Sequence, residues 1–133
     1  MNPQHADRFD SLLKEVFAAL PESVRAIVDE VAVVVLDRPT PEILEDLEMD
    51  PDEAGDLCGL HTGMMATERS VEDAWTMPSQ IHLFREGIID AGGGFDDAGS
   101  DERVREQIRI TLLHEIGHEF GLDEDQLRDL GYD

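Results

Sequence analysis

Apolar residues recur at helical spacing near the start of the chain. Between Ala6 and Ala19 they fall three and four positions apart, which predicts an amphipathic helix with a core face of Phe9, Leu12, Leu13, Val16, Phe17 and Leu20. Pro21 has no backbone N–H and ends this helix. It suits the first turn of a second short helix, whose apolar positions are Val24, Ile27 and Val28.

Two later segments read as strands. Val31 to Leu36 is continuously apolar and rich in β-branched residues, which predicts a strand buried on both faces. Thr40 then caps a short helix that has Pro41 in its first position. Gln80 to Arg85 alternates as a half-exposed strand should, with Ile81 and Leu83 opposed to His82 and Phe84. Between these segments the signals are weaker, and we expect a short strand with a tight turn over residues 56–63 and another strand near 64–67.

The final third of the chain holds a loop and one long helix. Ala91 to Ser100 contains four of the eleven glycines and is expected to be a flexible loop rather than a packed element. Ser100 can cap the helix that follows, and Gly121 ends it. Apolar residues cover most of the helix circumference towards its end, so its C-terminal half should be buried. Residues 125–130 add one or two turns.

These elements predict an α+β fold for residues 1–133 as a single domain. We expect a small mixed β-sheet of three or four strands, with an N-terminal helix and with the long C-terminal helix packed beneath the sheet.

Charge narrows the choice of partners. The chain has 32 acidic and 10 basic residues, a net charge of −22. Nucleic acid is an unsuitable partner, because binding phosphates requires a basic face, and anionic membranes are disfavoured for the same reason. The acidic residues are interpreted as a solvated surface, with an acidic patch for a basic partner as the alternative.

The chain carries one cysteine, Cys58, which excludes an intrachain disulfide and a CxxC metal site. The N-terminal residues do not resemble a signal peptide, and the longest apolar run, six residues, is too short to cross a bilayer. We therefore expect a cytoplasmic location.

The buried half of the last helix contains the motif HEIGHEFGLDE. His114 and His118 are four residues apart, so both imidazoles lie on one helix face and can reach one metal ion. Glu115 lies close enough to contact a water on that metal without binding the metal itself. Buried histidine and glutamate side chains are costly without partners, and a bound ion provides one. We expect one zinc ion per chain.

A third ligand is expected just beyond the helix. Only 15 residues follow His118, which does not fit zincins whose third ligand is a glutamate on a later helix. In the HExxHxxGxxH arrangement a glycine reverses the chain at the eighth position, where Gly121 stands, and the eleventh position is Glu124. Asp123 and Asp125 flank Glu124 and remain alternatives.

This segment resembles the small bacterial zincin-like proteins, also called minimal metalloproteases, whose motif reads HExxHxxGxxD. Weaker similarity covers about two thirds of the chain and includes the segments VAVVVLDRP, GLHTG and QIHLF. The resemblance implies that His114 and His118 bind the metal, that Glu115 is catalytic and that Gly121 makes the turn. Glu124 stands where the family usually has aspartate.

The resemblance implies a zinc-dependent metallopeptidase, in which Glu115 is the general base that activates water. In related folds the strand corresponding to QIHLF holds an extended peptide, so the expected partner is a peptide or protein substrate. Candidate oxyanion donors are His61, His82 and Tyr132. The alternatives are a zinc-binding protein without hydrolytic activity, a zinc hydrolase of a non-peptide amide and, least favoured by the charge, a ribonuclease.

Overall fold

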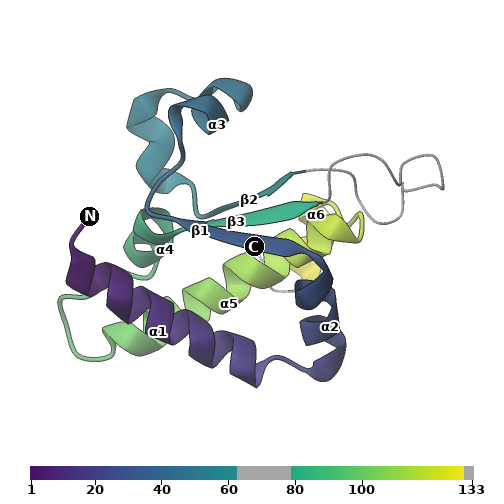
Figure 1. Cartoon of the computed structure of the whole chain (residues 1–133), viewed down its shortest axis with the longest axis horizontal. Helices are drawn as coiled ribbons and strands as arrows, with labels where there is room; N and C mark the ends of the chain where they lie inside the picture. The colour runs from purple at the N-terminus through teal and green to yellow at the C-terminus, as the bar shows by residue number, and fades with distance from the viewer. Residues whose placement is uncertain (63–78, 131–133) are drawn as a thin grey trace.

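The computed structural model of the chain describes residues 1–62 and 79–130. Figure 1 shows helices gathered around a small sheet. The elements, in chain order, are α1 (Pro3–Ala19), α2 (Glu22–Glu30), β1 (Ala32–Leu36), α3 (Pro41–Asp46), the 3-10 helix η1 (Pro51–Asp56), β2 (Gly59–Thr62), β3 (Gln80–Phe84), α4 (Arg85–Ala91), α5 (Ser100–Glu119) and α6 (Glu124–Leu130). Within the described residues, no helix is long and apolar enough to cross a membrane.

The mixed sheet has three strands in the order β1-β3-β2. β3 pairs in parallel with β1 and antiparallel with β2, so β3 is the central strand. The expected α+β fold with a small mixed sheet is confirmed. The strand expected near residues 64–67 falls outside the described residues.

The burial of β1 differs from the expectation, whereas that of β3 follows it except at Phe84. The β1 strand lies at an edge of the sheet, and its residues are half-buried or exposed rather than enclosed on both faces. The β3 strand alternates as expected over its first four residues, with Ile81 and Leu83 fully buried and Gln80 and His82 half-buried. Only Phe84 departs from the pattern, because it is fully buried as well.

The core lies between the sheet and two long helices. α1 and α5 both lie on one side of the sheet (Figure 1). From α1, Phe9, Leu12, Leu13 and Val16 are buried, as their spacing predicted. They pack in one cluster with Ile81 and Leu83 of β3 and with Val104, Ile108 and Leu112 of α5. The C-terminal half of α5 is buried beneath the sheet, as expected.

The loop before α5 is more ordered than its glycines suggested. Phe95 is buried, and the Arg8 guanidinium lies 4.3 Å from the centre of its ring. Ser100 is the first residue of α5 rather than its cap, which is Gly99. The Ser100 hydroxyl instead accepts a hydrogen bond of 3.1 Å from Arg8. The expectation of an unpacked loop was therefore wrong, because contacts to α1 hold this segment.

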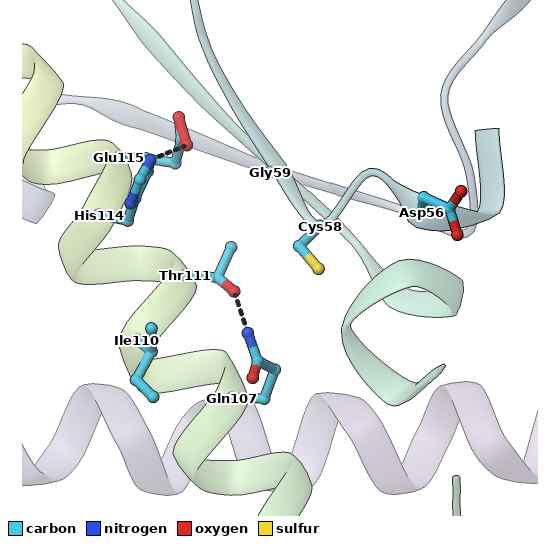
Figure 2. Close-up of a pocket in the computed structure, with 8 residues that line it drawn as sticks. All are labelled: Asp56, Cys58, Gly59, Gln107, Ile110, Thr111, His114 and Glu115. Carbon is cyan, nitrogen blue, oxygen red and sulfur yellow. Dashed lines mark hydrogen bonds and ion pairs between the residues drawn. The ribbon is translucent and has the colours of Figure 1, made fainter. Parts of the chain in front are cut away.

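Two short helices, η1 and α4, were not anticipated, and α4 packs against the chain that leads into β2. In α4, Gly87 lies so close to the chain before β2 that an added Cβ atom would be 2.1 Å from the Leu57 carbonyl oxygen. In β2, an added Cβ at Gly59 would be 2.8 Å from Thr111 Cγ2 on α5. These close approaches bring β2 against the middle of α5, where the two elements border a cavity (Figure 2).

Candidate metal centre

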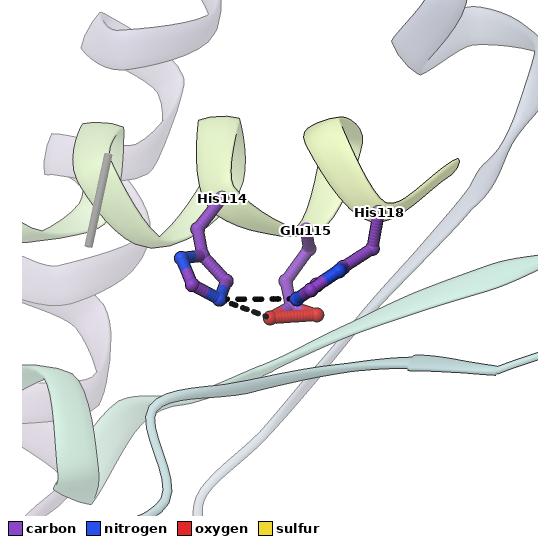
Figure 3. Close-up of side chains that lie close together, drawn as sticks. All are labelled: His114, Glu115 and His118. Atoms are coloured by element: carbon purple, nitrogen blue, oxygen red, sulfur yellow. Dashed lines mark hydrogen bonds and ion pairs between the residues drawn. The ribbon is translucent and has the colours of Figure 1, made fainter. Parts of the chain in front are cut away.

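The C-terminal half of α5 presents three motif side chains on one face. His114, Glu115 and His118 point from the helix towards the strands (Figure 3). Ile116 and Gly117, between them in sequence, are buried. One helical turn separates the two histidines, and their Nε2 atoms lie 3.1 Å apart. Local sequence spacing is therefore enough to bring the two imidazoles together.

Glu124, the first residue of α6, completes a triangle with the two histidines. Its Oε1 atom is 3.0 Å from His118 Nε2 and 3.4 Å from His114 Nε2. A tetrahedral zinc ion with bonds of about 2.0–2.1 Å separates neighbouring ligand atoms by about 3.3 Å. The three donor atoms therefore have the spacing of one face of a zinc coordination tetrahedron.

The turn after α5 brings Glu124 to this position. Phe120 is the C-cap residue, and Gly121 has a φ of 79°, a left-handed conformation that favours glycine. The Leu122 amide then bonds to the Gly117 carbonyl at 3.0 Å and closes the turn. The predicted helix end at Gly121 is confirmed.

A hydrogen bond in the same turn orients His118. Its Nδ1 atom lies 3.2 Å from the Leu122 carbonyl oxygen, which can only accept a hydrogen bond. The Nδ1 position therefore carries the proton, and the Nε2 lone pair points towards His114 and Glu124. Metal-binding histidines usually make a bond of this kind through their second nitrogen.

The two aspartates that flank Glu124 have other partners. Asp123 accepts a hydrogen bond of 2.8 Å from the Gln126 amide, and the Gln126 side chain accepts one of 2.9 Å from the Asp123 amide. This reciprocal pair caps the start of α6. Asp125 is paired with Arg128 at 3.2 Å. Of the three carboxylates left open by the sequence, Glu124 is the one beside the histidines.

Glu115 is more deeply buried than the histidines and stands apart from the triangle. Its carboxylate is 4.0 Å from His114 Nε2, longer than the ligand spacing. Burial raises the pKa of Glu115 from 4.5 to about 7, while His114 opposes this rise and Glu124 adds to it. A cation held by the histidines would favour the ionised carboxylate. The carboxylate is therefore placed beside the donor atoms, where it can accept a proton from a neighbouring water.

An open cavity lies in front of these groups. It has a volume of about 510 Å³, and its walls are formed by the motif side chains and by β2, through Gly59, Leu60, His61, His114, Glu115, His118 and Glu124. A tetrahedral ion bound by three protein atoms keeps one position open. The cavity leaves room for a water or a substrate beside the three donor atoms.

The three candidate oxyanion donors lie in different places. His61 is on the face of β2 towards α5, and its Nε2 atom is 2.6 Å from the Glu119 carboxylate. His82 pairs with Leu60, and strand alternation places it on the opposite face of the sheet, away from α5. Tyr132 lies outside the described residues. Of the two candidate oxyanion donors whose positions are described, His61 lines the cavity and His82 does not.

The pair between His61 and Glu119 is a feature that sequence reasoning missed. Both side chains are almost completely buried, with 8% and 4% exposed. The pair joins β2 to the last turn of α5, directly after His118. A glutamate at a buried helical position beside the motif was the available signal, since such a group needs a partner.

The comparison with protein families agrees with this geometry. A family model described as zincin-like metallopeptidase matches residues 28–132, which include the sheet, α5 and α6. A search of curated proteins finds no match.

Proposed function

The chain belongs to the zincin-like metallopeptidase family, and from this premise we propose that it is a zinc-dependent peptidase. Membership implies a metal ion, usually zinc, and peptide substrates. The observation that supports activity in this chain is the triangle of His114, His118 and Glu124 donor atoms, with edges of 3.0 to 3.4 Å, beside a buried carboxylate.

The proposed ligands are the two histidines and Glu124, with one zinc ion per chain. These residues would hold the ion, which would supply Lewis acidity towards a carbonyl oxygen and a bound water. Two neutral imidazoles and one carboxylate are donors that suit zinc.

Glu115 is the proposed general base. Its carboxylate borders the same cavity as the ligands, so it can take a proton from the attacking water. It then passes this proton to the leaving amine as the peptide bond breaks. The buried position keeps other water away from the carboxylate and fixes its orientation.

The β2 strand is the proposed platform for the substrate. β3 cannot pair with a peptide, because it is paired along both edges. Among the described strands, β2 pairs only with β3, and it lines the cavity in front of the histidines. An extended peptide can bond to the outer edge of β2 through its main chain. This assignment replaces the expectation that the QIHLF strand holds the peptide.

Comparison of wild type with Glu115→Gln tests the proposal. The variant should bind zinc as wild type does, because the amide replaces a group that is not a ligand. Its turnover of a peptide library should fall on the order of a hundredfold or more. Zinc content by mass spectrometry and cleavage by chromatography measure the two properties separately.

Three outcomes contradict the proposal in different ways. If wild type does not bind zinc at neutral pH, the proposed zinc site is wrong. Zinc binding without cleavage of any peptide favours a non-catalytic zinc protein. Cleavage of amide compounds other than peptides, sensitive to Glu115→Gln, favours a hydrolase of another substrate class.

A further inference from the structure

A second, smaller cavity borders the candidate metal centre. We call it the side pocket; its volume is about 190 Å³, and it is lined by Asp56, Cys58, Gly59, Gln107, Ile110, Thr111, His114 and Glu115. It shares Gly59, His114 and Glu115 with the larger cavity. A water molecule occupies about 30 Å³, so the side pocket has room for one long side chain.

The walls of the side pocket come from two elements. On α5, Gln107 donates a hydrogen bond of 3.3 Å to the Thr111 hydroxyl, one turn before His114. The segment between η1 and β2 supplies the opposite wall. Figure 2 shows Cys58 between this bonded pair and Asp56, which stands at the other end of the labelled group. The pocket is therefore bordered by Glu115 at one end and by the exposed residue Asp56 at the other.

Charge in the side pocket is negative. Asp56 and Glu115 are both acidic, and none of the described residues that line the pocket is a lysine or arginine. Burial raises the pKa of the Cys58 thiol, and the negative charges of Asp90, Asp56 and Glu115 raise it further. With no ion bound, these acidic groups favour a cation near Cys58. A zinc ion on His114 would offset this at the Glu115 end of the pocket and leave Asp56 as the acidic group at the other end.

We propose that the side pocket is a specificity subsite that receives a lysine or arginine side chain next to the scissile bond, with Asp56 as its ion-pair partner. This inference rests on the proposed peptidase function. A substrate side chain that enters beside Glu115 can extend its apolar stem past Thr111 and Cys58. Its charged end then reaches the exposed Asp56 carboxylate, where both charges keep part of their hydration.

Cleavage-site profiling of a mixed peptide library tests the substrate preference. Lysine and arginine should be enriched at one position flanking the cleaved bond. Asp56→Asn should lower kcat/KM for a basic peptide about threefold relative to its norleucine analogue, the size expected for an exposed ion pair. Asp56→Lys should shift the preference towards aspartate and glutamate. Asp52→Asn is the matched control, since Asp52 is an exposed acid on the same 3-10 helix but does not line the pocket.

The single cysteine provides a test that does not need activity. Cys58 lines the side pocket, so the rates at which cationic and anionic methanethiosulfonates of similar size modify it report the local potential. The ratio of cationic to anionic rate should fall on the order of threefold or more in Asp56→Asn. In Asp52→Asn, which changes the net charge equally, the ratio should stay close to that of wild type.

The two experiments fail in distinguishable ways. Cleavage with no basic preference, or with a preference that Asp56→Lys leaves unchanged, overturns the subsite and leaves the peptidase function intact. Equal rate ratios in Asp56→Asn and Asp52→Asn also overturn it. If wild type cleaves nothing, the proposed function and the substrate assignment both fail, and the rate ratio alone decides whether the pocket prefers cations.

Discussion

Three neighbouring acids after the motif helix have three different partners. Asp123 caps α6, Asp125 pairs with Arg128, and Glu124 lies against the two motif histidines. The side chain of glutamate is one methylene longer than that of aspartate, the usual residue at this position of the motif. The turn at Gly121 places this longer side chain at ligand distance.

Alanine substitution of each acid tests the ligand assignment. Glu124→Ala should weaken zinc binding about a hundredfold or more, because only two histidine ligands remain. Asp125→Ala should change the affinity little, and Asp123→Ala should act mainly through the lost helix cap, at a cost of about 1 kcal/mol in stability. Competition with a chelating dye measures all three affinities. Zinc binding by Glu124→Ala as tight as that of wild type contradicts the assignment.

His82 should make the free energy of unfolding depend on pH. Its Nδ1 atom is buried, with no hydrogen-bond partner among the described residues, and burial lowers its pKa from 6.5. As pH falls below about 6.5, the unfolded chain gains a proton that the folded state resists, so stability is lost on acidification. His82→Leu should lose less free energy of unfolding than wild type between about pH 7.5 and pH 5. Urea unfolding at both pH values measures this, and equal losses would contradict it.

At the scale of elements, α4 packs against the chain before β2 and so fixes the position of β2 relative to α5. Gly87 is buried in α4, and Leu57 immediately precedes the side-pocket residue Cys58. A shift of this contact moves β2 relative to α5. The position of one edge strand therefore depends on a glycine in a neighbouring helix.

Substitution of Gly87 tests this contact. Alanine favours a helix over glycine by about 1 kcal/mol, but its Cβ would lie 2.1 Å from a backbone oxygen. The clash should outweigh the helix preference, and Gly87→Ala should lower the free energy of unfolding by about 3 kcal/mol. Gly55→Ala is the control, since nothing lies within 4 Å of its added Cβ, and it should change stability by less than about 0.5 kcal/mol. Equal stabilities of the two variants in urea unfolding would show that the contact relaxes freely.

At the scale of the whole molecule, the net charge of −22 opposes the compact state. The arginines make ion pairs such as Arg8–Asp101 and Arg85–Asp10, but the chain has 32 acidic residues and only 10 basic ones to pair with them. Exposed pairs contribute little, so repulsion between acids should dominate the response to salt.

Salt should therefore stabilise the protein. Raising potassium chloride from about 0.01 M to about 0.5 M shortens the screening length from about 30 Å to a few Å. We expect the melting temperature to rise on the order of 5 °C. Sucrose at equal osmolality is the control, because it is excluded from the protein surface but does not screen charges. A melting temperature that falls with salt would show that the ion pairs outweigh the repulsion.

Features that depend on local spacing could be predicted from the amino-acid order alone. The helical period predicted α1 and the buried half of α5, and Gly121 marked the end of α5 because its conformation suits glycine. The four-residue interval brings His114 and His118 together on any α-helix, so this part of the candidate site followed from the chain alone.

Tertiary structure decided what depends on contacts between distant residues. The order β1-β3-β2 made β3 the buried centre and left β2 beside the cavity, which the alternation of residues within each strand could not reveal. His61 and Glu119 are 58 positions apart, and only the approach of β2 to α5 makes them partners. Periodicity reports which face of an element is apolar, whereas the neighbour that covers this face is chosen by the packing of the whole chain.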